Sequence, residues 1–151
     1  MLLICRDFVV VYILAMIGLI GLSIAIEAAL GTDLSTVLNI IPQIVAAQTA
    51  GQRHGRRTGI RPENGFSWKA AGWMTLVSFV LSLIAAGGLI VYMGPGDAAP
   101  LWEFLQSQFV LVGTVIAVIL VIYVLLSRFF FGLGAKQGAK FSPNTDAEIF
   151  R

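Results

Sequence analysis

The side chains of this sequence best suited to hold a polar ligand are the amides of Asn39 and Gln43, which flank Pro42 in an apolar stretch. A proline inside a helix removes a backbone hydrogen bond, and interrupted helices with free polar groups form the midplane sites of many transporters. Ser78 and Ser82, one helical turn apart in a later apolar stretch, could contribute hydroxyls. The alternative, which we favour, is a kinked helix whose amides bond to neighbouring helices at about 0.6 kcal/mol apiece.

A second set of candidates is basic and comprises Arg53, Arg56, Arg57 and Arg61. Such residues are held against an anionic leaflet at about 1 kcal/mol per charge, and they could instead dock a cytoplasmic partner. His54 lies among them, where positive charge repels cations, so we expect a solvated residue and no metal site.

Sequence patterns of known catalytic sites are absent: there is no HExxH, paired cysteine, GxSxG or Walker pattern. The segment 132–136 has two glycines and a lysine but not the spacing of a phosphate loop, so its glycines are expected to end or pack a helix. The apolar stretches contain no ionisable residue in their centres, which disfavours an ion-coupled pump. We therefore expect no enzyme and no cofactor.

The composition predicts a membrane protein, because 58% of the residues are hydrophobic and 12% are charged, against about 25% charged in globular chains. The apolar residues form four blocks of about the 20 residues that a helix needs to cross roughly 30 Å of hydrocarbon. The sequence thus predicts an all-α, integral membrane four-helix transmembrane bundle, a single membrane domain over 1–151. Its helices are expected at about 8–29, 34–51, 68–93 and 104–130. The first block exceeds the roughly 7 to 15 apolar residues of a signal peptide, so we expect it to be retained.

The second predicted helix is the least apolar, with seven Leu, Ile and Val residues among polar side chains, and it needs neighbouring helices. The third carries a face of small residues that would let another helix approach closely. This face consists of Ala71, Gly72, Thr75, Ser78, Ser82, Ala85 and Ala86.

The basic residues predict the topology. All ten lie before the first block, between the second and third, or after the fourth. The positive-inside rule then places both termini and a basic loop, 52–67, in the cytoplasm. The connection over 94–103, with Pro95 and Pro100, is expected to be a turn, and 141–151 a polar tail. Because the basic residues flank apolar blocks, we expect the bilayer as a partner and no nucleic acid.

Three stretches make the chain resemble a family of small four-helix proteins of the bacterial inner membrane, of unknown function. They are the segment from Asn39-Ile40-Ile41-Pro42 to Ala46-Ala47, the arginine-rich connection, and Phe131-Gly132-Leu133-Gly134-Ala135-Lys136. The resemblance implies a bacterial origin, the inner membrane and four helices, whereas the polar tail departs from it. We expect an accessory or scaffolding subunit of a membrane complex, or a self-associating bundle; the alternative is a small oligomeric transporter or channel.

Overall fold

All secondary structure is helical within the residues that the structure, a computed structural model, describes. These are 1–30 and 40–141, without the side chains of 24–30, 89, 93, 95–98 and 101. The predicted all-α class is confirmed for these ranges. The helices are α1 (Leu2–Leu30), α3 (Ile41–Thr58), α4 (Asn64–Met93), α5 (Pro95–Ser107) and α6 (Phe109–Ala139).

Three of these helices are long and apolar enough to cross a membrane: α1 over Leu2–Ser23, α4 over Asn64–Tyr92 and α6 over Phe109–Ala139. At 1.5 Å per residue, the 31 residues of α6 extend about 46 Å, more than the roughly 30 Å of a hydrocarbon layer. Helix α6 is therefore longer than a helix needs to be to cross such a layer. Helix α3 has 18 residues but carries glutamines, arginines and a histidine, so its composition falls short of that of the other three.

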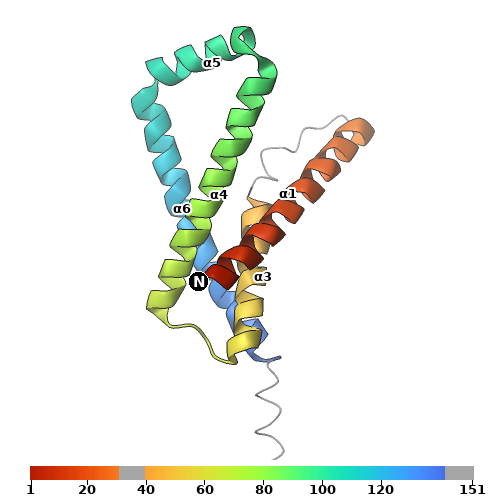
Figure 1. Ribbon diagram of the computed structural model, residues 1–151, viewed down its shortest axis with the longest axis vertical. Coiled ribbons are helices and arrows are strands. Elements are labelled where there is room, and N and C mark those ends of the chain that lie inside the picture. The colour runs from red at the N-terminus through yellow and green to blue at the C-terminus, as the bar shows by residue number, and fades with distance from the viewer. Residues whose placement is uncertain (31–39, 142–151) are drawn as a thin grey trace, which may run out of the picture.

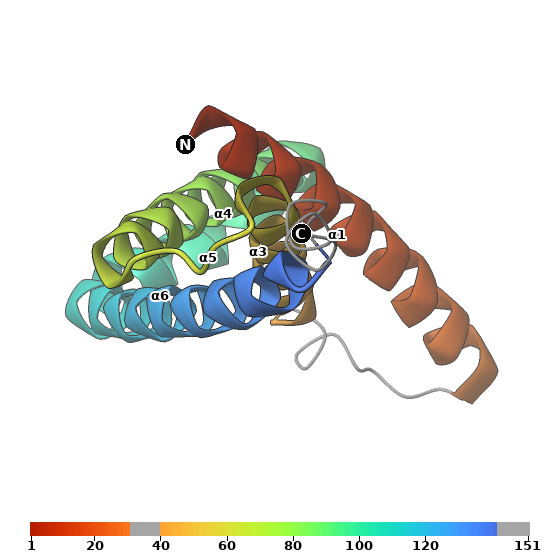
Figure 2. The same cartoon turned by 90° about the horizontal axis from the view of Figure 1, so that it is seen from below.

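The helices pack together at one end and diverge at the other. Figure 1 shows α1, α4 and α6 spreading apart from a shared region, with α5 bridging the far ends of α4 and α6. Seen from below in Figure 2, α3 lies between α1 and the pair formed by α4 and α6. Among the side chains that the structure describes, the buried ones lie in four segments, 4–12, 42–55, 67–78 and 127–138, which define the packed end.

Glycines bring α3 and α6 into backbone contact at the packed end. A Cβ atom at Gly51 would collide with the carbonyl oxygen of Phe131, and one at Gly55 with the carbonyl oxygen of Ala135. Gly134 and Gly138 of α6 are equally close to the carbonyl oxygens of α3. Because residue numbers rise together along the contact, the two helices run parallel, and their GxxxG spacing is that of closely packed membrane helices.

The apolar core of the packed end is centred on Phe8, Met74 and Phe131, all of them buried. On α1, Ile4, Phe8 and Tyr12 recur every four residues, so they share one face. The rings of Phe8 and Tyr12 stack with their centroids 5.6 Å apart. Through this face the start of α1 packs against α3 and α4.

The basic connection expected over 52–67 is much shorter in the structure. Helix α3 continues to Thr58 and α4 begins at Asn64, so only 59–63 connects them. Gly55, which was taken for a loop residue, serves close packing against α6, and the arginines of 53–57 lie on a helix. Gly59, in a left-handed conformation with φ 68°, ends α3.

The turn expected over 94–103 is also different, since most of it belongs to the 13-residue helix α5. Pro95 lies in its first turn, where a missing N–H costs nothing, and Pro100 lies inside it. The helix predicted over 104–130 is consequently divided at Gln108, whose φ of −115° is not helical.

Candidate functional site

Asp7 is a buried carboxylate that joins α1 to α3. It is 3% exposed, and its oxygens lie 3.2 Å from Arg53 Nη1 and 2.9 Å from Arg57 Nη1. These arginines are four residues apart on α3, so they reach the carboxylate from one helix face. Burying a carboxylate requires such partners, and the cluster therefore ties the two helices together. Sequence reasoning missed Asp7, although a lone acid bordering an apolar block at the basic end was a usable signal.

Gln43 is fully buried between α3 and α6. Its Nε2 donates a hydrogen bond to Ser127 Oγ at 2.6 Å, while its Oε1 has no hydrogen-bond partner among the described residues. Pro42 lies in the first turn of α3, so it does not kink the described helix as expected. Asn39 lies outside the described residues.

The two serines of α4 differ in their surroundings. Ser78 is buried, and its hydroxyl donates to Met74 O at 2.9 Å on its own helix. Ser82 is exposed and lines a cavity of about 170 Å³ between α1 and α4, together with apolar residues such as Met16. Gln43, Ser78 and Ser82 therefore do not line one polar cavity.

His54 was expected to be solvated, yet it is half-buried in an aromatic stack. Its ring centroid lies 5.1 Å from that of Phe66 and 5.8 Å from that of Phe131. Burial lowers the pKa of His54, and the positive charges of the amino terminus and Arg57 lower it further.

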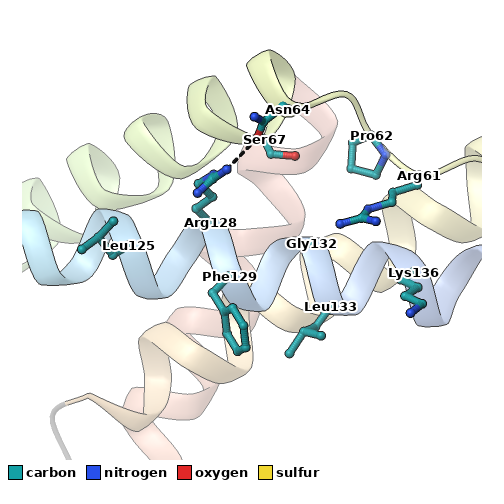
Figure 3. A pocket seen from close by; sticks show the side chains of 10 residues that line it. All are labelled: Arg61, Pro62, Asn64, Ser67, Leu125, Arg128, Phe129, Gly132, Leu133 and Lys136. Atoms are coloured by element: carbon teal, nitrogen blue, oxygen red, sulfur yellow. Dashed lines mark hydrogen bonds between the residues drawn. The ribbon is translucent and has the colours of Figure 1, made fainter.

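The two remaining arginines predicted as contact residues lie at the surface of the packed end. Arg56 is exposed, with its guanidinium carbon 5.9 Å from the ring centroid of Phe141. Arg61, in the connection between α3 and α4, lines the pocket shown in Figure 3.

That pocket, here called the basic pocket, measures about 540 Å³ and lies between α6, the 59–63 connection and the first turn of α4. Its cationic side chains are Arg61, Arg128 and Lys136. The full lining is Arg61, Pro62, Asn64, Ser67, Leu125, Arg128, Phe129, Gly132, Leu133 and Lys136. Sequence analysis did not place Arg128 or Lys136 in a site with Arg61, because their approach to Arg61 depends on the fold.

Arg128 is held in place on the wall of the basic pocket. Its Nη2 donates to Asn64 Oδ1 at 2.6 Å, the dashed line in Figure 3. Its guanidinium carbon also lies 4.2 Å from the ring centroid of Trp68, which is a cation–π distance. These contacts fix the guanidinium between α4 and α6.

Among the residues described, no three His, Cys, Asp or Glu side chains are grouped closely enough to hold a metal ion. Comparison of the chain with protein-family models, with curated proteins and with solved structures finds no match.

Proposed function

We propose that this chain is a non-catalytic polytopic protein of the bacterial inner membrane, in which α1, α3, α4 and α6 cross the bilayer and both termini lie in the cytoplasm. We further propose that it acts as an accessory or scaffolding subunit whose far end packs against other membrane helices. The distribution of basic residues supports this orientation through the positive-inside rule. The parallel directions of α3 and α6 agree with four crossings.

The observation that carries the subunit proposal is the small-residue face of α4, which is only half covered. Ala71, Thr75 and Ser78 are buried against the rest of the chain, whereas Ala85 and Ala86 on the same face are exposed. Lipid tails are as apolar as leucine, so contact with lipid does not require small residues. Small side chains do favour close helix association in membranes.

Space around the far end supports the same proposal. A Cβ atom at Gly18 of α1 or at Gly113 of α6 would meet no atom within 4 Å, in contrast to the glycines of the packed end. The divergence of α1 from α4 also leaves the 170 Å³ cavity open beside Ala85. A helix from another subunit, or from a second copy, would find both room and a close-packing surface here.

The test is extraction in mild detergent followed by native electrophoresis and mass spectrometry of the isolated protein. We expect a stoichiometric partner with the native chain and its loss in the double variant Ala85→Leu, Ala86→Leu. Gly87→Leu is the matched control, because it adds the same side chain on the opposite face of α4, where there is open space. A native chain isolated as a lone monomer, or equal loss of partner in the control, would refute the proposal.

A transporter or channel remains the alternative hypothesis, and no observation favours it. It requires Gln43 to face a hydrated path, whereas this amide is buried and bonded to Ser127. We therefore base the proposed function on the packing surfaces.

A further inference from the structure

The basic pocket has a surplus of positive charge that the fold does not neutralise. Elsewhere at the packed end, Arg53 and Arg57 are matched by the carboxylate of Asp7. Within 1–30 and 40–141, Arg61, Arg128 and Lys136 form no ion pair, and the lining of the pocket includes no acidic residue. A ligand that entered this pocket would therefore gain most from carrying negative charge.

The donors around the pocket suit a phosphate group. The guanidinium of Arg128, oriented by Asn64 and Trp68, presents planar donors that match phosphate oxygens. The first turn of α4 forms another wall, and its free backbone N–H groups add partial positive charge. The volume of the basic pocket, about 540 Å³, also lies within the range of about 300–1,000 Å³ typical of ligand sites.

The pocket also has an apolar wall that points to the rest of the ligand. Leu125, Phe129 and Leu133 line the pocket from α6 and are all exposed, and in Figure 3 Phe129 and Leu133 lie on the opposite side of α6 from Arg128. The 19 residue steps from Phe109 to Arg128 rise about 29 Å, which is one hydrocarbon thickness. With α6 inserted from Phe109, Arg128 lies at the headgroup level, Leu125 within the hydrocarbon and Lys136 beyond it.

We propose that the basic pocket binds the phosphate of an anionic phospholipid, with Arg61, Arg128 and Lys136 around the headgroup and an acyl chain along Leu125. The ligand then has a polar end and an apolar end that match the two walls. This site rests on the insertion of α6 in a membrane and does not depend on the far end packing against a partner.

The experiment uses the full chain in neutral detergent, stripped of lipid and titrated with phosphatidylglycerol while native mass spectrometry measures binding. Phosphatidylcholine of the same chain length tests the preference for net negative charge, and inorganic phosphate tests whether the headgroup chemistry alone suffices. We expect Arg128→Gln with Lys136→Gln to weaken phosphatidylglycerol binding about 25-fold. This is about 5-fold per charge, or about 1 kcal/mol at 1.4 kcal/mol per tenfold.

The matched control is Lys69→Gln with Lys140→Gln, which removes two positive charges of exposed lysines that do not line the pocket. We expect it to stay within about two-fold of the native affinity. Arg61→Gln is a second test in case the double variant does not fold, because Arg61 lies in a connection and forms no ion pair among the described residues. We expect this single substitution to weaken phosphatidylglycerol binding about 5-fold.

Equal losses in the pocket and control variants, or equal affinity for phosphatidylcholine, would overturn the site. Inorganic phosphate that bound as tightly as the lipid would overturn the assignment to a phospholipid. A preference for phosphatidylglycerol that only the pocket variants lose would support it, whether or not a partner subunit is found.

Discussion

Replacing Asp7 by Asn tests whether the buried carboxylate holds α1 against α3. Removing one partner of a fully buried ion pair costs about 3–5 kcal/mol, but the side chains of Arg53 and Arg57 are 46% and 43% exposed. Each guanidinium therefore keeps contact with water or headgroups, which lowers the loss to about 1 kcal/mol per pair. We expect Asp7→Asn to lower the free energy of separating α1 from α3 by about 2 kcal/mol.

Cys5 supplies the assay, because this half-buried thiol lies two residues from Asp7 and becomes accessible when α1 separates. A loss of 2 kcal/mol corresponds to a rise of about 30-fold in its labelling rate by a thiol reagent in mild detergent. Arg6→Gln is the control, since Arg6 is 68% exposed and 4.0 Å from the carboxylate, and its effect should stay below about 0.5 kcal/mol. The double variant Asp7→Asn, Arg57→Gln should lower the free energy of separating α1 from α3 by less than the sum of the two single losses. Unchanged labelling in Asp7→Asn, or an equal rise in Arg6→Gln, would refute the reasoning.

Three further predictions concern the contact of α3 with its neighbours. Gly51→Ala should lower the free energy of unfolding in detergent by about 1–3 kcal/mol, because the added Cβ atom meets backbone that cannot rotate away. Gly113→Ala, in open space, should be neutral or slightly stabilising. Equal effects of the two substitutions would contradict the close packing of α3 on α6. Because burial lowers the pKa of His54 in the folded chain, the unfolded chain binds the proton at a higher pH, and the free energy of unfolding should fall as the pH drops from about 7.5 to about 5.5. His54→Gln should remove that part of the pH dependence. A pH dependence that is the same in the variant and the native chain would contradict this assignment to His54. Gln43→Leu should change the free energy of unfolding by about 1 kcal/mol or less, because it removes one hydrogen bond to Ser127. Ion flux in liposomes should stay at background in both the variant and the native chain. A flux in the native chain that the variant abolishes would support the transporter hypothesis instead.

The parts of the fold that were predictable from sequence are those that local composition determines. Apolar runs of about 20 residues specify helices whatever they pack against, and α1, α4 and α6 follow from them. The end of α3 could not be predicted in this way. Gly55 and the arginines near it suit a loop by composition, and only the approach of α6 gives these residues a reason to remain helical.

The candidate sites depended even more on distant partners. Gln43 was recognised as a polar residue in an apolar stretch, but its partner Ser127 lies 84 residues away. Arg61 was expected to contact lipid or a partner, and its neighbours Arg128 and Lys136 in the basic pocket come from the other end of the chain. Residue type showed which side chains could bind a polar or charged group, whereas the three-dimensional arrangement determined which ones lie together.

The parallel contact of α3 with α6 has a consequence for the order of synthesis. Gly51 and Gly55 of α3 are synthesised 80 residues before Phe131 and Ala135, the residues of α6 that cover them, which is about 4–16 s at 5–20 residues per second. During that interval α3 is held by α1, through Asp7, and by α4, through the stacking of Phe66 on His54, while its glycines remain uncovered. Ribosome-bound chains that stop before Ser127 should therefore expose α3 to proteases and chaperones, and the last helix to be made is the one that completes the fold.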